Sequence, residues 1–231
     1  MKGRRVVITG LGAISPLGNS VAELWDGVSN GRSGIADITA WDASGYTTRF
    51  GGEIRNFDAA DVFGSAKEAR KCDPFIHYGV AATREALAHA GLSIDDSNAH
   101  RIGVHVGSGI GGIGTIESTV RLIERNQSVR RVSPFFVPSS IINMISGNIS
   151  IQTGARGPNL ATVTACTTGA HCIGLSARLI AYGDADVMIA GGAEHGSSPA
   201  GLAGFCAARA LSQRNDDPQR ASRPFDQDRD G

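Results

Sequence analysis

The residue of this sequence best suited to covalent chemistry is a cysteine in the middle of the chain. Cys166 follows the alternating β-branched run LATVTA at residues 160–165, and the small polar residues Thr167, Thr168 and Gly169 come after it. A thiolate is a strong nucleophile, and small neighbours leave an electrophile room to approach. The pattern indicates attack by sulfur on the carbonyl carbon of a thioester.

The elements around Cys166 are expected to present it at the edge of a sheet. Residues 160–165 read as a strand and residues 166–183 as a long helix that ends at Gly183. Ligands gather beyond the carboxyl ends of parallel strands. In the first turn of the helix, free backbone N–H groups and the positive end of the helix dipole favour a thiolate over a thiol. The same N–H groups can stabilise an oxyanion.

Two other interpretations of these cysteines are possible. A buried cysteine can serve as a small hydrophobe, and we keep that interpretation for Cys172 and Cys206, which lie in apolar helical stretches. A Cys–His hydrolase would need His171 as the base for Cys166, but five residues along a helix separate the two side chains by about 140°. The other histidines are scattered without metal-ligand spacing to a cysteine, so neither a metal nor another cofactor is expected.

Glycine-rich turns at two places raise the alternative of nucleotide binding. Residues 107–112, GSGIGG, follow a predicted strand and fit GxGxxG, and residues 8–14 read ITGLGAI. The dinucleotide fingerprint needs a helix that opens at once and an acidic residue that ends the next strand. Glu117, the next acidic residue, falls inside the predicted helix, and Pro16 stands where the first helix should begin. Close approach of this backbone to a substrate, or to the loop of Cys166, is favoured.

The rest of the chain alternates between strand and helix patterns. Asp73-Pro74 and Gly91 mark the start and stop of the clearest helix. Strands are predicted at residues 4–12, 101–109, 160–165 and 185–194, and helices at residues 20–28, 74–90, 117–125, 139–154, 166–183 and 198–211. This alternation is typical of an α/β fold in which a mostly parallel sheet lies between helical layers.

The bulk composition excludes several classes of protein. The 22 basic and 22 acidic residues balance, so no overall field favours nucleic acid. Apolar runs stay shorter than the roughly 18 residues that a membrane span needs, and the N-terminus lacks the apolar region of a signal peptide. The 4 cysteines form no CxxC pair, which indicates reduced thiols in the cytoplasm.

Seven segments, in order along the whole chain, carry a family resemblance: VVITGLGAISPLG, GSGIGG, SPFFVPSSIINM, GPNLATVTACTTGAH, YGDADVMIAGGAE, GFCAARALS and SRPFDQDRDG. The sequence is similar to the β-ketoacyl-acyl-carrier-protein synthases of fatty-acid synthesis, with their type 2 enzymes as the nearest match. TACTTG and SRPFD are the most specific segments. Polyketide ketosynthases are similar but usually carry a TACSSS-like sequence, and chain-length factors lack the cysteine.

The resemblance implies a thiolase-like fold in which two related halves pack their sheets between helices. Residues 1–231 would be the N-terminal half, and the C-terminal half is expected to be missing from a truncated sequence. It also implies that Cys166 accepts an acyl group from acyl carrier protein and supplies a backbone N–H to the oxyanion hole. Malonyl-carrier protein would then decarboxylate, and its carbanion would attack the Cys166 thioester in a Claisen condensation.

The family's two histidines and lysine for decarboxylation come from its second half, and none of the 6 histidines here stands in a matching motif. Residues 1–231 alone are therefore expected not to condense substrates. The resemblance implies a homodimer, which the family pairs through the strand before the cysteine.

Further positions match the family's substrate and carrier sites. Ile110 corresponds to the gate of the acyl pocket, and Phe136, Ala165 and Phe205 correspond to its lining, although ordinary core packing would explain these three equally well. Six basic residues correspond to places that receive the acidic carrier protein: Lys67, Arg70, Lys71, Arg130, Arg131 and Arg209.

Two alternatives remain open at this point. The spacing of Lys67, Arg70 and Lys71 would place them on one face of a helix, and an ordinary solvated face would look the same. The chain could also be a polyketide-type ketosynthase, or a non-catalytic domain that binds acyl groups or nucleotides through its glycine loops.

Overall fold

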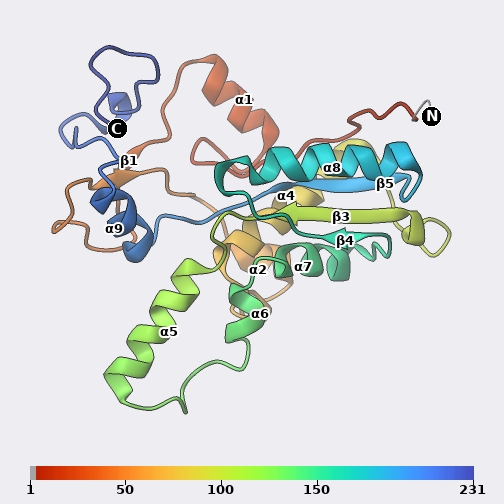
Figure 1. Ribbon diagram of the computed structural model, residues 1–231, viewed down its shortest axis with the longest axis horizontal. Coiled ribbons are helices and arrows are strands. Elements are labelled where there is room, and N and C mark those ends of the chain that lie inside the picture. Colours follow the sequence, from red (N-terminus) through yellow and green to blue (C-terminus); the bar gives the residue numbers. More distant parts are fainter. Residues whose placement is uncertain (1–3) are drawn as a thin grey trace. The chain divides into compact units, whose positions relative to one another are not determined.

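A parallel sheet organises the part of the chain that carries Cys166. In the computed structural model, which describes residues 4–231, the central strand is β3 (Ile102–Gly107), which is buried along its whole length. It lies between β4 (Asn159–Leu160) and β5 (Val187–Gly192), and both pairings are parallel (Figure 1). The carboxyl ends of β3 and β5 therefore meet at one edge of the sheet.

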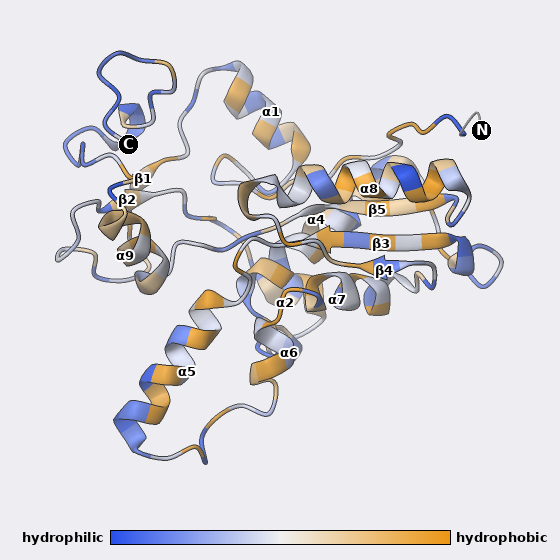
Figure 2. Cartoon of the chain, in the orientation of Figure 1, coloured by the Kyte–Doolittle hydropathy of each residue, from blue (hydrophilic) through white to orange (hydrophobic). Residues whose placement is uncertain are grey.

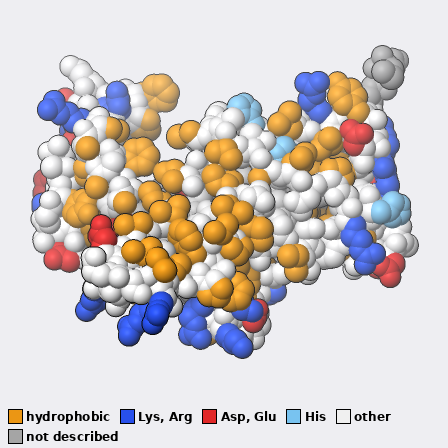
Figure 3. Space-filling model, turned by 60° about the horizontal axis from the view of Figure 1, so that its bottom comes forward, with side chains coloured by type: hydrophobic (Ala, Val, Ile, Leu, Met, Phe, Trp, Pro, Cys, Tyr) orange, Lys and Arg blue, Asp and Glu red, His pale blue; other side chains and the backbone are white. Residues whose placement is uncertain are grey.

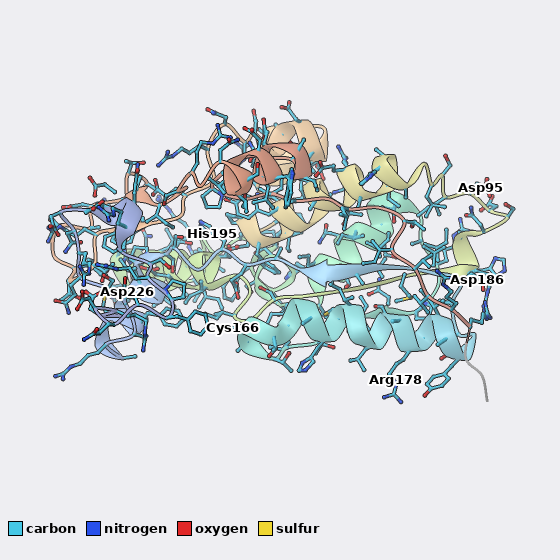
Figure 4. All side chains as sticks on the ribbon, turned by 90° about the horizontal axis from the view of Figure 1, so that it is seen from above. Asp95, Cys166, Arg178, Asp186, His195 and Asp226 are labelled. Atoms are coloured by element: carbon cyan, nitrogen blue, oxygen red, sulfur yellow. The ribbon has the colours of Figure 1, made fainter. Side chains whose placement is uncertain are left out.

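Helices cover both faces of this sheet. One face carries α8 (Thr168–Tyr182), which packs on β3 and β5. The other face carries α7 (Met144–Thr153), which packs on β3 and β4 and is backed by α4 (Pro74–Ala90). Figure 4, in which the molecule is seen from above, shows the sheet between these helices. This arrangement confirms the predicted α/β fold with a parallel sheet between helical layers.

The described chain forms two compact units. The second unit combines Ala13–Phe57 with Gly196–Gly231, and the first holds the rest, including the sheet and Cys166. The second unit contains these elements: α1 (Val21–Ser29), β1 (Ala36–Asp37), β2 (Phe50–Gly51), α9 (Pro199–Ala207) and the 3₁₀ turn η3 (Pro218–Arg220). The first unit also contains α2 (Ala59–Phe63), α3 (Ala66–Ala69), η1 (Ala99–Arg101), α5 (Ile113–Asn126), α6 (Phe136–Ser140) and the 3₁₀ turn η2 (Ala165–Thr167).

The best-signalled helix forms as predicted. The carboxylate of Asp73 accepts a hydrogen bond from the backbone N–H of Phe75, Pro74 is the first helical residue, and Gly91 ends α4 in the left-handed conformation at φ 60°. Asp73 also accepts hydrogen bonds from the backbone N–H and the hydroxyl of Thr115, at 3.0 and 2.7 Å. One buried carboxylate thus holds the starts of α4 and α5 together.

The predicted strand at residues 4–12 is wrong. This segment, within the described chain, forms no strand, and Val7 and Ile8 are 60% and 77% exposed. Single contacts hold it instead: the N–H of Leu11 donates to Nδ1 of His89, and Gly10 lies so close to α4 that a Cβ would fall 2.2 Å from a carbonyl oxygen. A short apolar run makes a strand only where a neighbouring edge supplies a hydrogen-bond ladder.

The predicted helix at residues 139–154 is in fact two helices. The backbone is extended at Ile141, which ends α6, and α7 begins at Met144. The break frees the carbonyl oxygen of Ser140, which accepts a hydrogen bond of 3.0 Å from the N–H of Gly112. The end of α6 is thereby tied to the glycine loop that follows β3.

The predicted strand at residues 160–165 is much shorter in the structure. Pairing with β3 ends at Leu160, because the hydroxyl of Ser146 occupies the next position. That hydroxyl accepts a hydrogen bond from the N–H of Val106 at 2.9 Å and lies 2.6 Å from the carbonyl oxygen of Leu160, to which it can donate. The chain therefore leaves the sheet before it reaches Cys166.

Candidate active site

Cys166 lies in η2, directly before α8, and it is exposed. Figure 4 shows it at the beginning of that helix. The sequence placed it in the first turn of the helix, whereas the structure places it in the 3₁₀ turn one residue before the N-cap, Thr167. The start of α8 follows immediately, so its unpaired backbone N–H groups and the positive end of its dipole still lie next to the cysteine.

Three threonines fix the turn that carries Cys166. The backbone N–H of Thr164 donates to the hydroxyl of Thr168 at 2.9 Å, and the hydroxyl of Thr167 donates to the carbonyl oxygen of Thr164 at 2.8 Å. Between them Ala165 adopts φ 53°, a left-handed conformation that is unfavourable for a residue with a Cβ. The hydrogen bonds hold this strained residue in place, and they fix the direction of the Cys166 backbone.

His171 has a partner other than Cys166. Its Nδ1 hydrogen-bonds with the hydroxyl of Thr164 at 2.7 Å. This agrees with the expectation that His171 is not the base of a Cys–His pair. The ring instead ties the second turn of α8 to the residue two positions before the cysteine.

Glycines allow the strand ends and the helix start to approach one another. A Cβ on Gly107 would fall 2.1 Å from the carbonyl oxygen of Thr162, and one on Gly192 would fall 3.1 Å from the Cα of Gly169. The first distance excludes a side chain at Gly107, and the second leaves only a tight fit at Gly192. The carboxyl ends of β3 and β5 can therefore lie directly against the start of α8.

The glycine loop after β3 lies beside the cysteine turn. A Cβ on Gly109 would be 3.4 Å from the Cα of Ala165, within van der Waals contact, so the loop runs close beside the turn. This confirms the predicted close approach of GSGIGG to the loop of Cys166. It also places Ile110, which is 43% exposed, on the loop that borders the turn of Cys166.

Glu194 is a site residue that the sequence did not reveal. It follows β5, and its carboxylate accepts hydrogen bonds from the hydroxyl of Ser108 and from the backbone N–H groups of Ile110 and Gly111. Backbone N–H groups of a glycine loop are what a nucleotide phosphate would bind. A carboxylate already occupies them here, which argues against the nucleotide-binding alternative. An acidic residue at the end of the strand beside the glycine loop was the one available signal.

The remaining residues matched to the acyl pocket lie in both units. Ala165 precedes the cysteine, and Phe136 is the half-buried first residue of α6. Phe205 belongs to α9 of the second unit and is 50% exposed. The structure thus brings Ala165 and the loop of Ile110 together.

The six basic residues matched to the carrier site differ in their exposure and their contacts. Lys67 and Arg70 are exposed, but α3 ends at Ala69, so the predicted helical face does not extend to Lys71. The ammonium of Lys71 forms a salt bridge of 2.6 Å with Glu68 and lies 5.1 Å from the ring centre of Phe135. Exposed arginines follow α5 and α9, namely Arg130, Arg131 and Arg209.

The other thiols have different surroundings. Burial, and then the negative charge of Glu68, raise the pKa of Cys72 to about 11. Cys172 is fully buried, as its interpretation as a small hydrophobe requires. Burial acts to raise the pKa of Cys206, but hydrogen bonds with Thr47 and Thr48 outweigh it, and the pKa is lowered. Cys206 is also only partly buried, so a hydrophobic role does not describe it fully.

Comparison with known proteins gives a consistent result. Residues 3–231 match the family described as "Beta-ketoacyl synthase, N-terminal domain". The 3-oxoacyl-[acyl-carrier-protein] synthase 2 of Vibrio cholerae is 56% identical over 232 residues, which cover 100% of this chain and 55% of the relative. The chain thus spans about half the length of the curated relatives it matches.

Solved structures agree with the sequence relatives. A beta-ketoacyl synthase from Burkholderia phymatum superimposes with a TM-score of 0.87 at 32% identity, over 100% of this chain and 56% of that one. AntDE:AntF, a type II PKS acyl-carrier protein in complex with its ketosynthase bound to the hexaketide, gives 0.82 at 27% identity, over 99% and 55%. These matches confirm the thiolase-like fold and the resemblance seen in the sequence. The chain belongs to the beta-ketoacyl synthase family and carries the family's N-terminal domain.

Proposed function

We propose that this chain carries the acyl-accepting site of a 3-oxoacyl-[acyl-carrier-protein] synthase 2 of fatty-acid elongation, with Cys166 as its nucleophile. The observation that carries the proposal is the exposed thiol of Cys166, held in a hydrogen-bonded turn directly before α8. The naming of the V. cholerae relative supports this choice of reaction.

In the first step, the acyl group arrives as a thioester on the acyl carrier protein, and the sulfur of Cys166 attacks its carbonyl carbon. The new C–S bond forms while the bond to the carrier's thiol breaks, and that thiol leaves with the proton of the cysteine. The oxyanion that forms in between accepts a hydrogen bond from the backbone N–H of Cys166. The start of α8 adds the favourable field of its dipole.

In the second step, malonyl-carrier protein loses CO₂, and its carbanion attacks the carbonyl carbon of the Cys166 thioester. A C–C bond forms while the C–S bond to Cys166 breaks, so the cysteine leaves as a thiolate and the β-ketoacyl product stays on the carrier. We assign decarboxylation to two histidines and a lysine of the second half of the family's fold. On this assignment residues 1–231 are the N-terminal half, accept the acyl group and do not condense substrates by themselves.

The acyl chain is proposed to run past Ile110 and along Phe136, Ala165 and Phe205. The support within the first unit is the contact between Gly109 and the cysteine turn. The carrier is proposed to dock through its acidic surface on the six basic residues Lys67, Arg70, Lys71, Arg130, Arg131 and Arg209. The solved complex of a ketosynthase with its acyl-carrier protein supports a carrier as the partner.

A homodimer is proposed as the working form. Apolar residues of α5 remain exposed, including Val120 at 48%, and Figure 2 shows hydrophobic and hydrophilic residues alternating along this helix. In the view of Figure 3, hydrophobic side chains are exposed beside charged ones. A second copy would bury such residues.

The free thiols support a cytoplasmic location. Across the described chain, every helix is too short or too polar to cross a membrane.

A polyketide-type ketosynthase is the second candidate, because a type II PKS ketosynthase is among the structural neighbours. Incubation of the chain with saturated acyl-carrier proteins tests the proposal. We expect the intact mass to increase by one acyl group while free carrier thiol is released in equal amount. If the chain accepts β-ketoacyl groups from their carrier proteins but does not accept saturated acyl groups, the polyketide candidate is supported instead. A chain that stays unmodified with both would contradict acyl transfer.

A further inference from the structure

The carboxylate of Glu194 holds the glycine loop that follows β3. Its Oε2 accepts a hydrogen bond of 2.7 Å from the N–H of Ile110. Its Oε1 accepts hydrogen bonds from the hydroxyl of Ser108 at 2.9 Å and from the N–H of Gly111 at 3.2 Å. All three donors therefore converge on one side chain that comes from the segment directly after the neighbouring strand β5.

This loop is the neighbour of the cysteine turn. Gly109 lies between two of the donors, and a Cβ there would be 3.0 Å from Oε2 of Glu194 and 3.4 Å from the Cα of Ala165. The carboxylate, the loop and the turn are thus packed in succession. The far end of the loop is tied separately, because the N–H of Gly112 donates to the carbonyl oxygen of Ser140.

A charged acceptor makes these hydrogen bonds strong ones. Hydrogen bonds to a carboxylate are about twice as strong as those between neutral groups. A glutamine at this position would retain one acceptor oxygen and turn an NH₂ group toward an N–H donor. At least one backbone N–H of the loop would then lose its partner, and the loop would move away from the position that it holds beside Ala165.

We infer that Glu194 is a positioning residue, which fixes Ile110 and its loop beside Cys166 and so sets how bulky an electrophile reaches the thiol. The inference rests on the proposed function in one respect: the bulky group would be the acyl chain of the substrate. The positioning itself is a property of the described contacts and can be measured without the acyl carrier.

The first measurement is hydrogen exchange of single amides by NMR. In Glu194→Gln we expect the N–H groups of Ile110 and Gly111 to exchange about tenfold faster than in the wild type, because their charged acceptor is lost. The amides of β3 should keep their protection. Glu124→Gln, at an exposed position of α5, is the matched control and should leave all these rates unchanged.

The second measurement is the selectivity of Cys166 toward two maleimides that differ only in the length of their N-alkyl chain. N-ethylmaleimide and N-dodecylmaleimide react with the same thiol, and their rate ratio cancels any general change in thiol reactivity. We expect the ratio to change by about threefold or more in Glu194→Gln and to stay constant in Glu124→Gln. If Glu194→Gln keeps slow amide exchange at Ile110 and Gly111 and leaves the ratio of the two maleimide rates unchanged, the inference is overturned.

A variant that unfolds locally is recognised by faster exchange throughout β3. In that case Ser108→Ala decides, since it removes one donor and leaves the carboxylate in place. A change in the maleimide rate ratio that is smaller than the one expected for Glu194→Gln supports the inference, and an unchanged ratio in Ser108→Ala overturns it. If the wild type takes no acyl group from any carrier while the maleimide ratio responds to Glu194→Gln, the proposed function fails and the positioning role stands.

Discussion

The hydroxyl of Thr164 and Nδ1 of His171 hydrogen-bond at 2.7 Å, across the turn that carries Cys166. The bond connects the end of the segment leaving the sheet to the second turn of α8. Together with the bonds of Thr167 and Thr168, it ties both ends of the cysteine turn through side-chain hydrogen bonds. Its geometry is therefore expected to depend on these side chains together.

We predict an energetic coupling between Thr164 and His171. Thr164→Val and His171→Ala each remove the same hydrogen bond, so the double variant should lose less stability than the sum of the two. Urea unfolding of the four proteins should give a coupling of about 0.5–1.5 kcal/mol, the usual net value of such a bond. Strictly additive losses would show that the bond contributes nothing.

Cys166 and Cys72 are predicted to react with iodoacetamide in a defined order. At pH 8 Cys166 should be alkylated before Cys72, because it is exposed. Cys72 should stay unmodified, since burial raises its pKa to about 11 and leaves almost none of it as thiolate. Cys72 should begin to react only as the pH approaches about 10. Peptide mass spectrometry at several pH values checks this order, and equal labelling of both thiols at pH 8 would contradict it.

Close packing at the end of β3 predicts a large effect of a single methyl group. Gly107→Ala would place a Cβ 2.1 Å from the carbonyl oxygen of Thr162, and we expect a loss of about 1–3 kcal/mol in unfolding free energy. Gly174→Ala is the matched control, because its Cβ would point into open space within α8. Helix propensity should make that variant more stable by about 0.5–1 kcal/mol. Equal effects of the two substitutions in urea would refute the packing argument.

The acid stability of the first unit is predicted to depend on Asp186. Hydrogen bonds from Arg101 and then from Arg4 hold the pKa of this aspartate well below its usual range. A lowered pKa means that the pairing stabilises the fold above about pH 4 and that this contribution is lost as the pH falls further.

Asp186→Asn removes the titrating group, so its unfolding free energy should fall less on acidification than that of the wild type. The difference should shrink at high salt, since all three side chains are partly exposed. Parallel pH profiles for the two proteins would contradict this assignment.

How far the sequence predicted the fold depended on where each element finds its hydrogen bonds. The start and end of α4 were predicted because Asp73, Pro74 and Gly91 act locally. Residues 4–12 were read as a strand because of the apolar run from Val6 to Ile8, and residues 160–165 because of their alternating β-branched residues. Their pairing depends on distant groups, and the hydroxyl of Ser146, which ends the pairing of β4, lies 14 residues from Leu160.

The same distinction between local signals and distant partners decided how much of the site could be predicted. Cys166 was recognised from its own neighbours, and the approach of the glycine loop followed from the absence of side chains in it. Glu194 was missed, because its three partners lie more than 80 residues earlier in the chain. The interruption of the helix at Ile141 was missed for a related reason, since it frees the carbonyl oxygen of Ser140 for a contact with Gly112.

The central claim is that Cys166 accepts an acyl group, and locating that group tests it most directly. The chain is incubated with a saturated acyl-carrier protein and digested with trypsin, which releases residues 157–178 with both Cys166 and Cys172. Fragment spectra then assign the acyl mass to one of the two sulfurs. The account predicts the acyl group on Cys166 and none in Cys166→Ala, while Cys206→Ala is acylated like the wild type. An acyl group on Cys172 or Cys206, or one that persists in Cys166→Ala, would contradict it.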